Sequence, residues 1–171
     1  ARQRGFDLVG ITSYEPSHYR DYYRQWLAEG RAGQMQYLHD RFDERTDPGT
    51  FLSGAKSVVC VAKTYYVPLA PSPHNTSGKI ARYALADDYH DWLKDGLYDI
   101  ADWLREQAPG SKTRCGTDTA PVRDKDRAAL AGGGVMGKNT CIINESAGSW
   151  LLLGDVLTAI ELPPHAPGVA R

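Results

Sequence analysis

The chain has 171 residues, enough for one domain with a substantial hydrophobic core. Its 20 Lys and Arg residues nearly balance its 21 Asp and Glu residues, which excludes a generally basic surface that would coat nucleic acid. No apolar run approaches the roughly 20 residues that cross a bilayer and no signal peptide opens the chain, so we expect a soluble, cytoplasmic protein without a membrane partner. A nucleic-acid partner would need a local basic patch or residues outside this chain.

Predicted strands and helices alternate along the chain without a repeat period. Short apolar runs bounded by turn residues predict strands at residues 6–11, 57–64, 79–84, 140–144 and 151–160. Apolar positions at helical spacing predict helices at residues 19–29, 35–40, 88–106 and 121–130. The run 57–64 is the clearest strand, because its continuous Val-rich stretch suits a strand covered on both faces. Three prolines predict a loop at residues 68–77.

This order of elements indicates a single α/β or α+β domain, with helices packed on a central mixed sheet. We assign residues 1–161 to this domain. Residues 162–171 include Pro163, Pro164 and Pro167, which exclude a helix or a central strand, so this segment is predicted to be a linker.

The three cysteines, Cys60, Cys115 and Cys141, lie far apart and form no Cys-x-x-Cys pair. Such a pattern gives no start to a zinc or iron–sulfur site. Cys60 falls in a predicted buried strand, where cysteine behaves as a small hydrophobic residue. We therefore expect reduced thiols and no metal ion held by this chain.

The most informative segments are an acid-bearing stretch and a glycine-rich loop. Thr117-Asp118-Thr119 places one carboxylate between two hydroxyls just before Pro121, and Gly132-Gly133-Gly134 opens a loop in which backbone can approach a ligand closely. The loop has the glycine and lysine spacing of a phosphate-binding P-loop. However, Asn139 stands where a P-loop needs Ser or Thr, and a charged helix precedes the loop instead of a strand. Together the segments predict a binding site beside a proton donor, rather than a nucleotide site.

With these segments, the chain resembles the N-terminal half of the epoxyqueuosine reductases. The resemblance includes Asp118-Thr119-Ala120-Pro121-Val122 and Gly137-Lys138-Asn139-Thr140. It continues in the same order and spacing at residues 5–11, 35–38, 45–48, 54–59, 78–84, 88–90 and 148–151. The resemblance implies an oxidoreductase of queuosine biosynthesis that uses cobalamin to reduce epoxyqueuosine in tRNA, on a nitroreductase-like corrinoid-binding scaffold.

The resemblance also implies partners and a missing half. The partners would be tRNA carrying epoxyqueuosine and an electron donor, and we expect a monomer. Two 4Fe–4S clusters would lie in a ferredoxin-like C-terminal half, which would follow the linker and is absent from this chain. Two sets of closely spaced cysteines beyond Arg171 would therefore identify the reductase.

By this resemblance, Asp118 is the catalytic proton donor. Reducing an epoxide to an alkene expels the ring oxygen, and a positioned acid protonates the developing alkoxide. Because the ordinary pKa of aspartate is about 3.9, burial or a nearby anion would have to raise the pKa of Asp118. From the residues alone, capping of a helix that begins at Pro121 is the preferred interpretation of Asp118, and the resemblance reverses that preference.

The resemblance assigns further residues to the cobalamin site. By position these are Arg45, Ala81, Asp118, Lys138, Asn139, Thr140, Ile142 and Leu153. The ammonium, amide and hydroxyl groups of residues 138–140 suit the amide rim of a corrin, and a small residue at Ala81 would let the macrocycle lie flat. From the residues alone, a loop that satisfies its own backbone is preferred for residues 138–140.

Three charged or titratable residues carry alternatives. Asp124 and Lys125 stand where the family usually has an acid followed by arginine, and are candidate substrate-binding residues. Lysine lacks the bidentate geometry of a guanidinium, and a solvated charged face is the alternative. His90 is rejected as a cobalt ligand, because its acidic neighbours at a helix start indicate a cap or surface role and the family is expected to hold cobalamin without a histidine on the metal.

Two other functions stay open on the sequence. One is a non-catalytic corrinoid-binding or trafficking module that kept the pocket without the cluster half. The other is a flavin-dependent, nitroreductase-like reductase on the same kind of scaffold.

Overall fold

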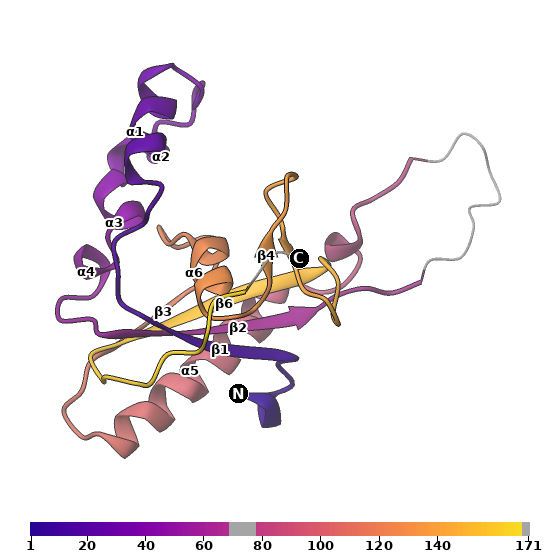
Figure 1. Ribbon diagram of the computed structural model, residues 1–171. Coiled ribbons are helices and arrows are strands. Elements are labelled where there is room, and N and C mark those ends of the chain that lie inside the picture. Colours follow the sequence, from indigo (N-terminus) through magenta and orange to yellow (C-terminus); the bar gives the residue numbers. More distant parts are fainter. Residues whose placement is uncertain (69–77, 169–171) are drawn as a thin grey trace.

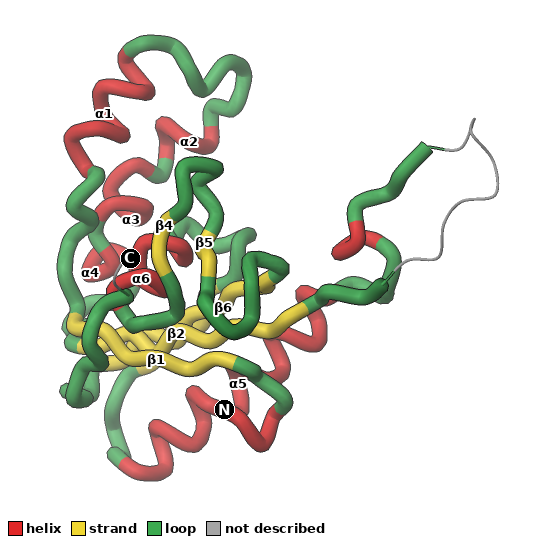
Figure 2. Tube along the Cα trace, turned by 45° about the vertical axis from the view of Figure 1, so that its right-hand side comes forward, coloured by secondary structure: helices red, strands yellow, loops and turns green. Residues whose placement is uncertain are grey.

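The computed structural model describes residues 1–68 and 78–168 (Figure 1). A four-stranded sheet in the order β1-β2-β6-β3 forms its centre, and a small hairpin of β4 and β5 stands over one face of that sheet (Figure 2). The strands are β1 (Leu8–Ser13), β2 (Ser57–Thr64), β3 (Thr113–Gly116), β4 (Val135–Met136), β5 (Ile142–Ile143) and β6 (Leu151–Thr158). The helices are α1 (Arg20–Ala28), α2 (Tyr37–Asp40), α3 (Phe42–Thr46), α4 (Pro48–Phe51), α5 (Tyr89–Gln107) and α6 (Asp124–Leu130), with 3-10 turns η1 (Arg2–Arg4) and η2 (Arg82–Ala84).

Strand β2 is central to the core, because helices cover both of its faces. On one face, Val59 and Val61 pack with the apolar side of the long helix α5. On the other face, Val58 and Cys60 pack with residues of α4 and with the end of α6. Strand side chains alternate between the two faces of a sheet, so a single Val-rich strand serves both layers. This confirms the prediction for residues 57–64.

Helices α1, α2 and α3 form an arm beside the sheet (Figure 1). The arm has its own small apolar cluster, with Tyr23, Leu27 and Ala32 buried. The rings of Tyr23 and Phe42 stack with their centroids 5.6 Å apart. The arm therefore has local packing that is separate from the two layers on the sheet.

The predicted α+β class is confirmed, but the predicted mixed sheet is wrong. Strand β2 pairs antiparallel with both β1 and β6, and β3 pairs antiparallel with β6. The continuous apolar run of β2 resembles a parallel strand only because helices cover both faces of this antiparallel sheet.

Two further element predictions need correction. Residues 79–84 form no strand. Their second half is the turn η2, and Ile80 is 66% exposed, so this segment does not pack against the sheet. The helix predicted for residues 121–130 begins only at Asp124, because Pro121 is buried in the irregular segment that precedes it. The loop predicted at residues 68–77 lies outside the described residues from residue 69 onward.

The proline-containing segment packs against the domain as far as the structure describes it. The backbone N–H of His165 donates to Ile11 O at 2.8 Å, and that of Gly168 donates to Ala129 O at 2.9 Å. Residues 162–168 thus run along the outer strand β1 and the end of α6, and they contain no helix or strand. Among residues 1–68 and 78–168, no helix is long and apolar enough to span a membrane.

Candidate functional site

The carboxyl group of Asp118 is held by two side chains from the first turn of α5. Asp118 lies in the loop that follows β3, and 50% of its side chain is exposed. The hydroxyl of Tyr89 donates to Asp118 Oδ2 at 2.5 Å, and His90 Nε2 lies 2.8 Å from Asp118 Oδ1. Both carboxylate oxygens are therefore oriented by donors, while the group stays open to a ligand.

The ring of His90 bridges two carboxylates. Its Nδ1 lies 2.6 Å from Asp88 Oδ1, and the same oxygen accepts the backbone N–H of His90 at 2.9 Å as the N-cap of α5. Only a protonated imidazole can donate from both ring nitrogens. Accordingly, the hydrogen bond to Asp88, together with the charges of Asp118 and Asp88, raises the pKa of His90 above its ordinary 6.5, against a smaller lowering by burial.

Tyr89 acts as a fixed donor in this group. Burial, followed by the hydrogen bond to Asp118, raises the pKa of its hydroxyl well above 10, so the hydroxyl keeps its proton at neutral pH. The ring stacks on His90 with the centroids 4.1 Å apart and meets Tyr83 edge-on. The aromatic contacts thus fix the direction of the Tyr89 hydroxyl.

Sequence reasoning identified Asp118 and missed its partners. The surface or cap role predicted for His90 is incomplete, since its ring contacts Asp118 as well as the capping residue Asp88. The available signal was the segment at residues 88–90, which carries an acid, a tyrosine and a histidine at a helix start. That signal did not reveal a contact with a loop 28 residues later.

The structure excludes Asp118 as a helix cap. Helix α6 begins at Asp124, and its N-cap position is Arg123, which makes no capping side-chain bond. The burial expected around Asp118 is also absent, because half of its side chain is exposed. A second carboxylate, Asp124, lies near enough for the charge of Asp118 to raise the pKa of Asp124.

The candidate substrate-binding pair divides between the interior and the surface. Asp124 is half-buried and accepts the backbone N–H of Lys125 at 2.8 Å, while the side chain of Lys125 is exposed. Burial, with a smaller contribution from the charge of Asp118, raises the pKa of Asp124. Lys125 therefore fits the solvated-face alternative, while the charge of Asp124 acts on a buried polar cluster.

That buried polar cluster consists of Cys60, Arg127 and Asp155. Arg127 Nη1 lies 3.7 Å from Asp155 Oδ2, and neither atom has a hydrogen-bond partner among the described residues. Burial raises the pKa of Asp155 to about 7, although the charge of Arg127 lowers it. Burial also raises the pKa of Cys60 well above its ordinary value, so this thiol is a packed, unreactive group.

The glycine-rich loop at residues 132–134 leads into β4, and residues 137–141 form the turn of the β4–β5 hairpin. Lys138, Asn139 and Thr140 are exposed at this turn, and Ile142 is buried at its base. Asn139 Oδ1 accepts the backbone N–H of Cys141 at 3.1 Å, so part of the polar character predicted for cobalamin satisfies the loop itself. Because the loop leads into a strand, the P-loop is excluded on geometry as well.

The other predicted cobalamin residues come from separate elements. Arg45 lies in α3 with its guanidinium 5.5 Å from the centre of the Tyr37 ring, and its Nε is buried without a hydrogen-bond partner among the described residues. Ala81 is exposed just before η2, and Leu153 is half-buried in β6 beside Gly133. The structure therefore groups residues 138–142 in one hairpin and leaves Arg45 and Ala81 on other segments.

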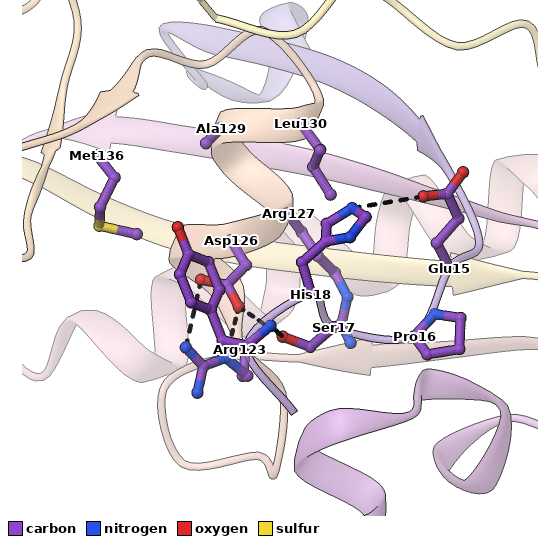
Figure 3. Close-up of a pocket in the computed structure, with 11 residues that line it drawn as sticks. Glu15, Pro16, Ser17, His18, Arg123, Asp126, Arg127, Ala129, Leu130 and Met136 are labelled. Carbon is purple, nitrogen blue, oxygen red and sulfur yellow. Dashed lines mark hydrogen bonds and ion pairs between the residues drawn. The ribbon is translucent and has the colours of Figure 1, made fainter. Parts of the chain in front are cut away.

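A cavity of about 150 Å³ lies between α6 and residues 15–19 (Figure 3). Its polar groups pair with one another: Asp126 accepts from Ser17 Oγ at 3.0 Å and forms an ion pair with Arg123. None of the residues predicted for the site lines it. Across the described parts of the chain, no group of three or more His, Cys, Asp or Glu side chains is placed to hold a metal ion.

Comparison with known proteins connects this geometry to one family. The family described as "Epoxyqueuosine reductase QueG, DUF1730" matches residues 45–119. The chain is 38% identical to the epoxyqueuosine reductase of Gloeobacter violaceus over 169 residues, which are 98% of this chain and 52% of that protein. The chain spans about half the length of the curated relatives it matches.

Solved structures agree. Epoxyqueuosine reductase from Streptococcus thermophilus superposes with a TM-score of 0.88 at 27% identity, covering 99% of this chain and 46% of that chain. An epoxyqueuosine reductase bound to an epoxyqueuosine-modified tRNA-Tyr stem loop gives 0.84 at 27% identity, covering 97% and 45%. A reductive dehalogenase studied for B12-dependent dehalogenation shares the fold, with a TM-score of 0.56 at 16% identity over 98% of this chain and 20% of that chain.

Proposed function

The chain belongs to the epoxyqueuosine reductase family, and on this premise we propose that it forms the cobalamin-binding catalytic half of an enzyme that reduces epoxyqueuosine to queuosine in tRNA. One observation carries the proposal: the exposed carboxyl of Asp118 is held between Tyr89 and His90, as a proton-delivering group would be. The reaction breaks both carbon–oxygen bonds of the epoxide and forms a carbon–carbon double bond. It consumes two electrons and two protons, and the oxygen leaves as water.

The β4–β5 hairpin and its surroundings fit a corrin by their chemistry. The turn offers an ammonium, an amide and a hydroxyl at residues 138–140, while Ile143 and Trp150 expose apolar surface nearby in the chain. A large, mostly apolar ligand with an amide rim needs this combination. With Ile142 and Leu153 beneath and Arg45 and Ala81 at other segments, these residues would hold the cofactor. Bound cobalamin would supply the electrons of the reduction.

Asp118 would deliver the proton to the leaving oxygen. An acid near the epoxide stabilises the alkoxide as the carbon–oxygen bond breaks. Asp118 is half exposed, and His90 is a titratable donor beside it. Because the imidazolium of His90 lies 2.8 Å from Asp118 Oδ1, we assign His90 as the proton reserve, the group that supplies a proton to Asp118. As Asp118 loses its proton, His90 can pass one to it, and Asp88 stabilises the imidazolium during the exchange. Tyr89 holds the second carboxylate oxygen in place.

The second half of the enzyme would lie outside this chain. We assign residues 1–161 to the catalytic domain and residues 162–171 to the passage toward a ferredoxin-like half with two 4Fe–4S clusters. That half would receive electrons from a separate donor protein. The similarity to relatives that are about twice as long supports this division.

The proposed activity can be tested in the complete protein that contains this chain. Supplied with cobalamin and a chemical reductant, it should convert epoxyqueuosine in a tRNA anticodon stem loop to queuosine, which mass spectrometry of the digested RNA detects as the loss of one oxygen. The same protein without cobalamin is the control and should give no product. Conversion that needs a flavin and proceeds without cobalamin would support the flavin-dependent alternative instead.

The proton reserve predicts two different pH profiles. His90→Gln should slow single-turnover reduction by about 10²-fold, a typical loss for an acid–base group. In the unaltered protein the rate should fall as pH rises through the pKa of His90, which lies above 6.5, because the imidazolium is lost. This fall should be absent in His90→Gln.

Tyr89→Phe serves as the matched comparison. It removes the other donor to Asp118 but leaves the His90 contact, so its rate should drop while the pH dependence persists. If His90→Gln retains the same fall in rate with pH, His90 is not the proton reserve and acts only in holding Asp118.

A further inference from the structure

A basic cleft lies beside the Asp118 loop. It has a volume of about 290 Å³ and is lined by Arg41, Lys94 and Arg114, by the hydroxyl residues Thr117 and Thr119, and by no carboxylate residue. The chain as a whole has almost balanced charge, so three cations in one cleft are a local feature. Guanidinium, ammonium and hydroxyl groups are the donors that bind phosphate oxygens.

The donors of the cleft are positioned by the fold. The Arg114 guanidinium stacks 3.9 Å from the centre of the Phe51 ring and donates from Nη1 to Phe51 O at 2.9 Å. This contact fixes the plane of the guanidinium beside the cleft. Arg41 already forms an ion pair with Glu44, a residue outside the cleft. Lys94 and Arg114 are therefore the cations to test.

The cleft adjoins the candidate active site. Thr117 and Thr119 flank Asp118 in sequence, and their hydroxyl oxygens lie 3.0 Å apart. Lys94 follows His90 by four residues in α5, so both side chains lie on the same side of that helix, one turn apart. The charge of Lys94 also acts on Asp88, the residue that bonds His90. A ligand that spans one helical turn, about 5.4 Å, could reach both places.

We propose that this cleft binds a phosphate of the RNA backbone next to the modified nucleoside, and so places that nucleoside at Asp118. The inference rests on the proposed function, because it takes the substrate to be RNA. Phosphate contacts set the position and orientation of a nucleic acid on a protein, while other contacts read its bases. The cleft supplies such a contact beside the reacting group, on a chain whose overall charge gives no general attraction to RNA.

The test removes two cleft cations in the complete protein. Lys94→Gln with Arg114→Gln should raise the Kd for an epoxyqueuosine stem loop about tenfold at low salt, and it should lower the slope of log Kd against log salt by about one, because the protein no longer neutralises the phosphate in the cleft. Lys56→Gln with Arg24→Gln is the matched control, because both residues are exposed cations outside the cleft and the change in net charge is the same. The control should leave the slope unchanged.

Two further measurements keep folding and cofactor effects apart. Lys94→Gln alone spares the contact of Arg114 with Phe51, and it should still lower the slope by about one. The visible spectrum of bound cobalamin should be unchanged in every variant. A cleft variant that binds RNA with the slope of the control overturns the proposal. Loss of cobalamin with normal RNA affinity overturns it too, and assigns the cleft to the phosphate of the cofactor.

Failure of the proposed function has a different signature. If the unaltered complete protein neither binds nor converts the epoxyqueuosine stem loop, both the function and the cleft proposal fall. If it converts the RNA while the cleft and control variants behave alike, only the cleft proposal falls.

Discussion

Asp118→Asn, made in the complete protein, should abolish the conversion of epoxyqueuosine while cobalamin stays bound. Asparagine keeps the size of aspartate and can still accept the hydrogen bond of Tyr89, but it cannot deliver a proton. Removing a general acid costs about 10²- to 10⁴-fold in rate. Single-turnover product formation, followed by mass spectrometry of the digested tRNA, measures the loss, and the visible spectrum of the cofactor reports its retention.

The control for this variant is Asp91→Asn. Asp91 is an exposed acid in the first turn of α5, so its replacement changes the local charge by the same amount without touching Asp118. Near-normal turnover in Asp118→Asn would remove Asp118 from the mechanism. Capping no longer offers an alternative explanation of a loss, because α6 begins six residues after Asp118 and is capped at Arg123 without a side-chain bond.

The sequence predicted β2 and α5 well, because these two elements depend mainly on their own residues. The strand at residues 57–64 was predicted with its observed bounds, since a short Val-rich run between turn residues favours a buried strand. The long helix α5 was predicted within one residue at each end, because its apolar residues recur at helical spacing and Asp88 caps its start. These elements would form in many tertiary contexts.

Strand directions and the segment at residues 79–84 depend on distant parts of the chain. Strand β2 pairs antiparallel with β1 and β6, and connections of tens of residues set these directions. The sequence of β2 itself therefore does not indicate the direction of its neighbours. The short run at residues 79–84 was predicted to be a strand, yet Ile80 and Tyr83 are exposed in a turn region. A short run with apolar residues does not show that a partner strand exists.

The sequence identified Asp118 as the central residue of the candidate site, but it did not identify the residues that contact Asp118. Asp118 stands out because it lies between hydroxyl residues and before Pro121. Its partners Tyr89 and His90 lie at the start of α5, which precedes β3 in the chain. They meet Asp118 only because the chain reverses direction between α5 and β3, and the sequence does not show this contact. The prediction of a cap places the start of a helix at Pro121. Instead, the backbone N–H of Ala120 donates to Thr117 O in a turn, and Pro121 is buried before the helix begins.

The buried pair of Arg127 and Asp155 lies beyond any sequence signal, and it gives the largest expected effect on stability. Arg127 is on α6 and Asp155 is on β6, and they are 6% and 1% exposed. At pH 9, Arg127→Met should lower the free energy of unfolding by about 3 kcal/mol, because it leaves a buried carboxylate without its counter-charge. Urea unfolding of the 171-residue chain measures the change.

The pH dependence distinguishes the loss of charge compensation from the loss of packing. The native pKa of Asp155 is about 7, above its ordinary 3.8, so the native state binds its proton more tightly and this residue lowers stability as pH rises from about 4 to about 7. Arg127 lowers that pKa, so without Arg127 the fall continues above pH 7, at up to about 1.4 kcal/mol per pH unit. At pH 6, where Asp155 is mostly neutral in both proteins, the loss should shrink to about 1 kcal/mol or less.

Replacing both partners completes the test. Arg127→Met with Asp155→Leu removes the buried carboxylate together with its counter-charge, and buried ion pairs exchanged for apolar residues are often neutral or stabilising. The double variant should therefore regain most of the stability that Arg127→Met loses at pH 9, and it should not show the pH dependence that Asp155 contributes. An equal loss for Arg127→Met at pH 6 and pH 9 would show that the arginine stabilises α6 on the sheet by packing alone.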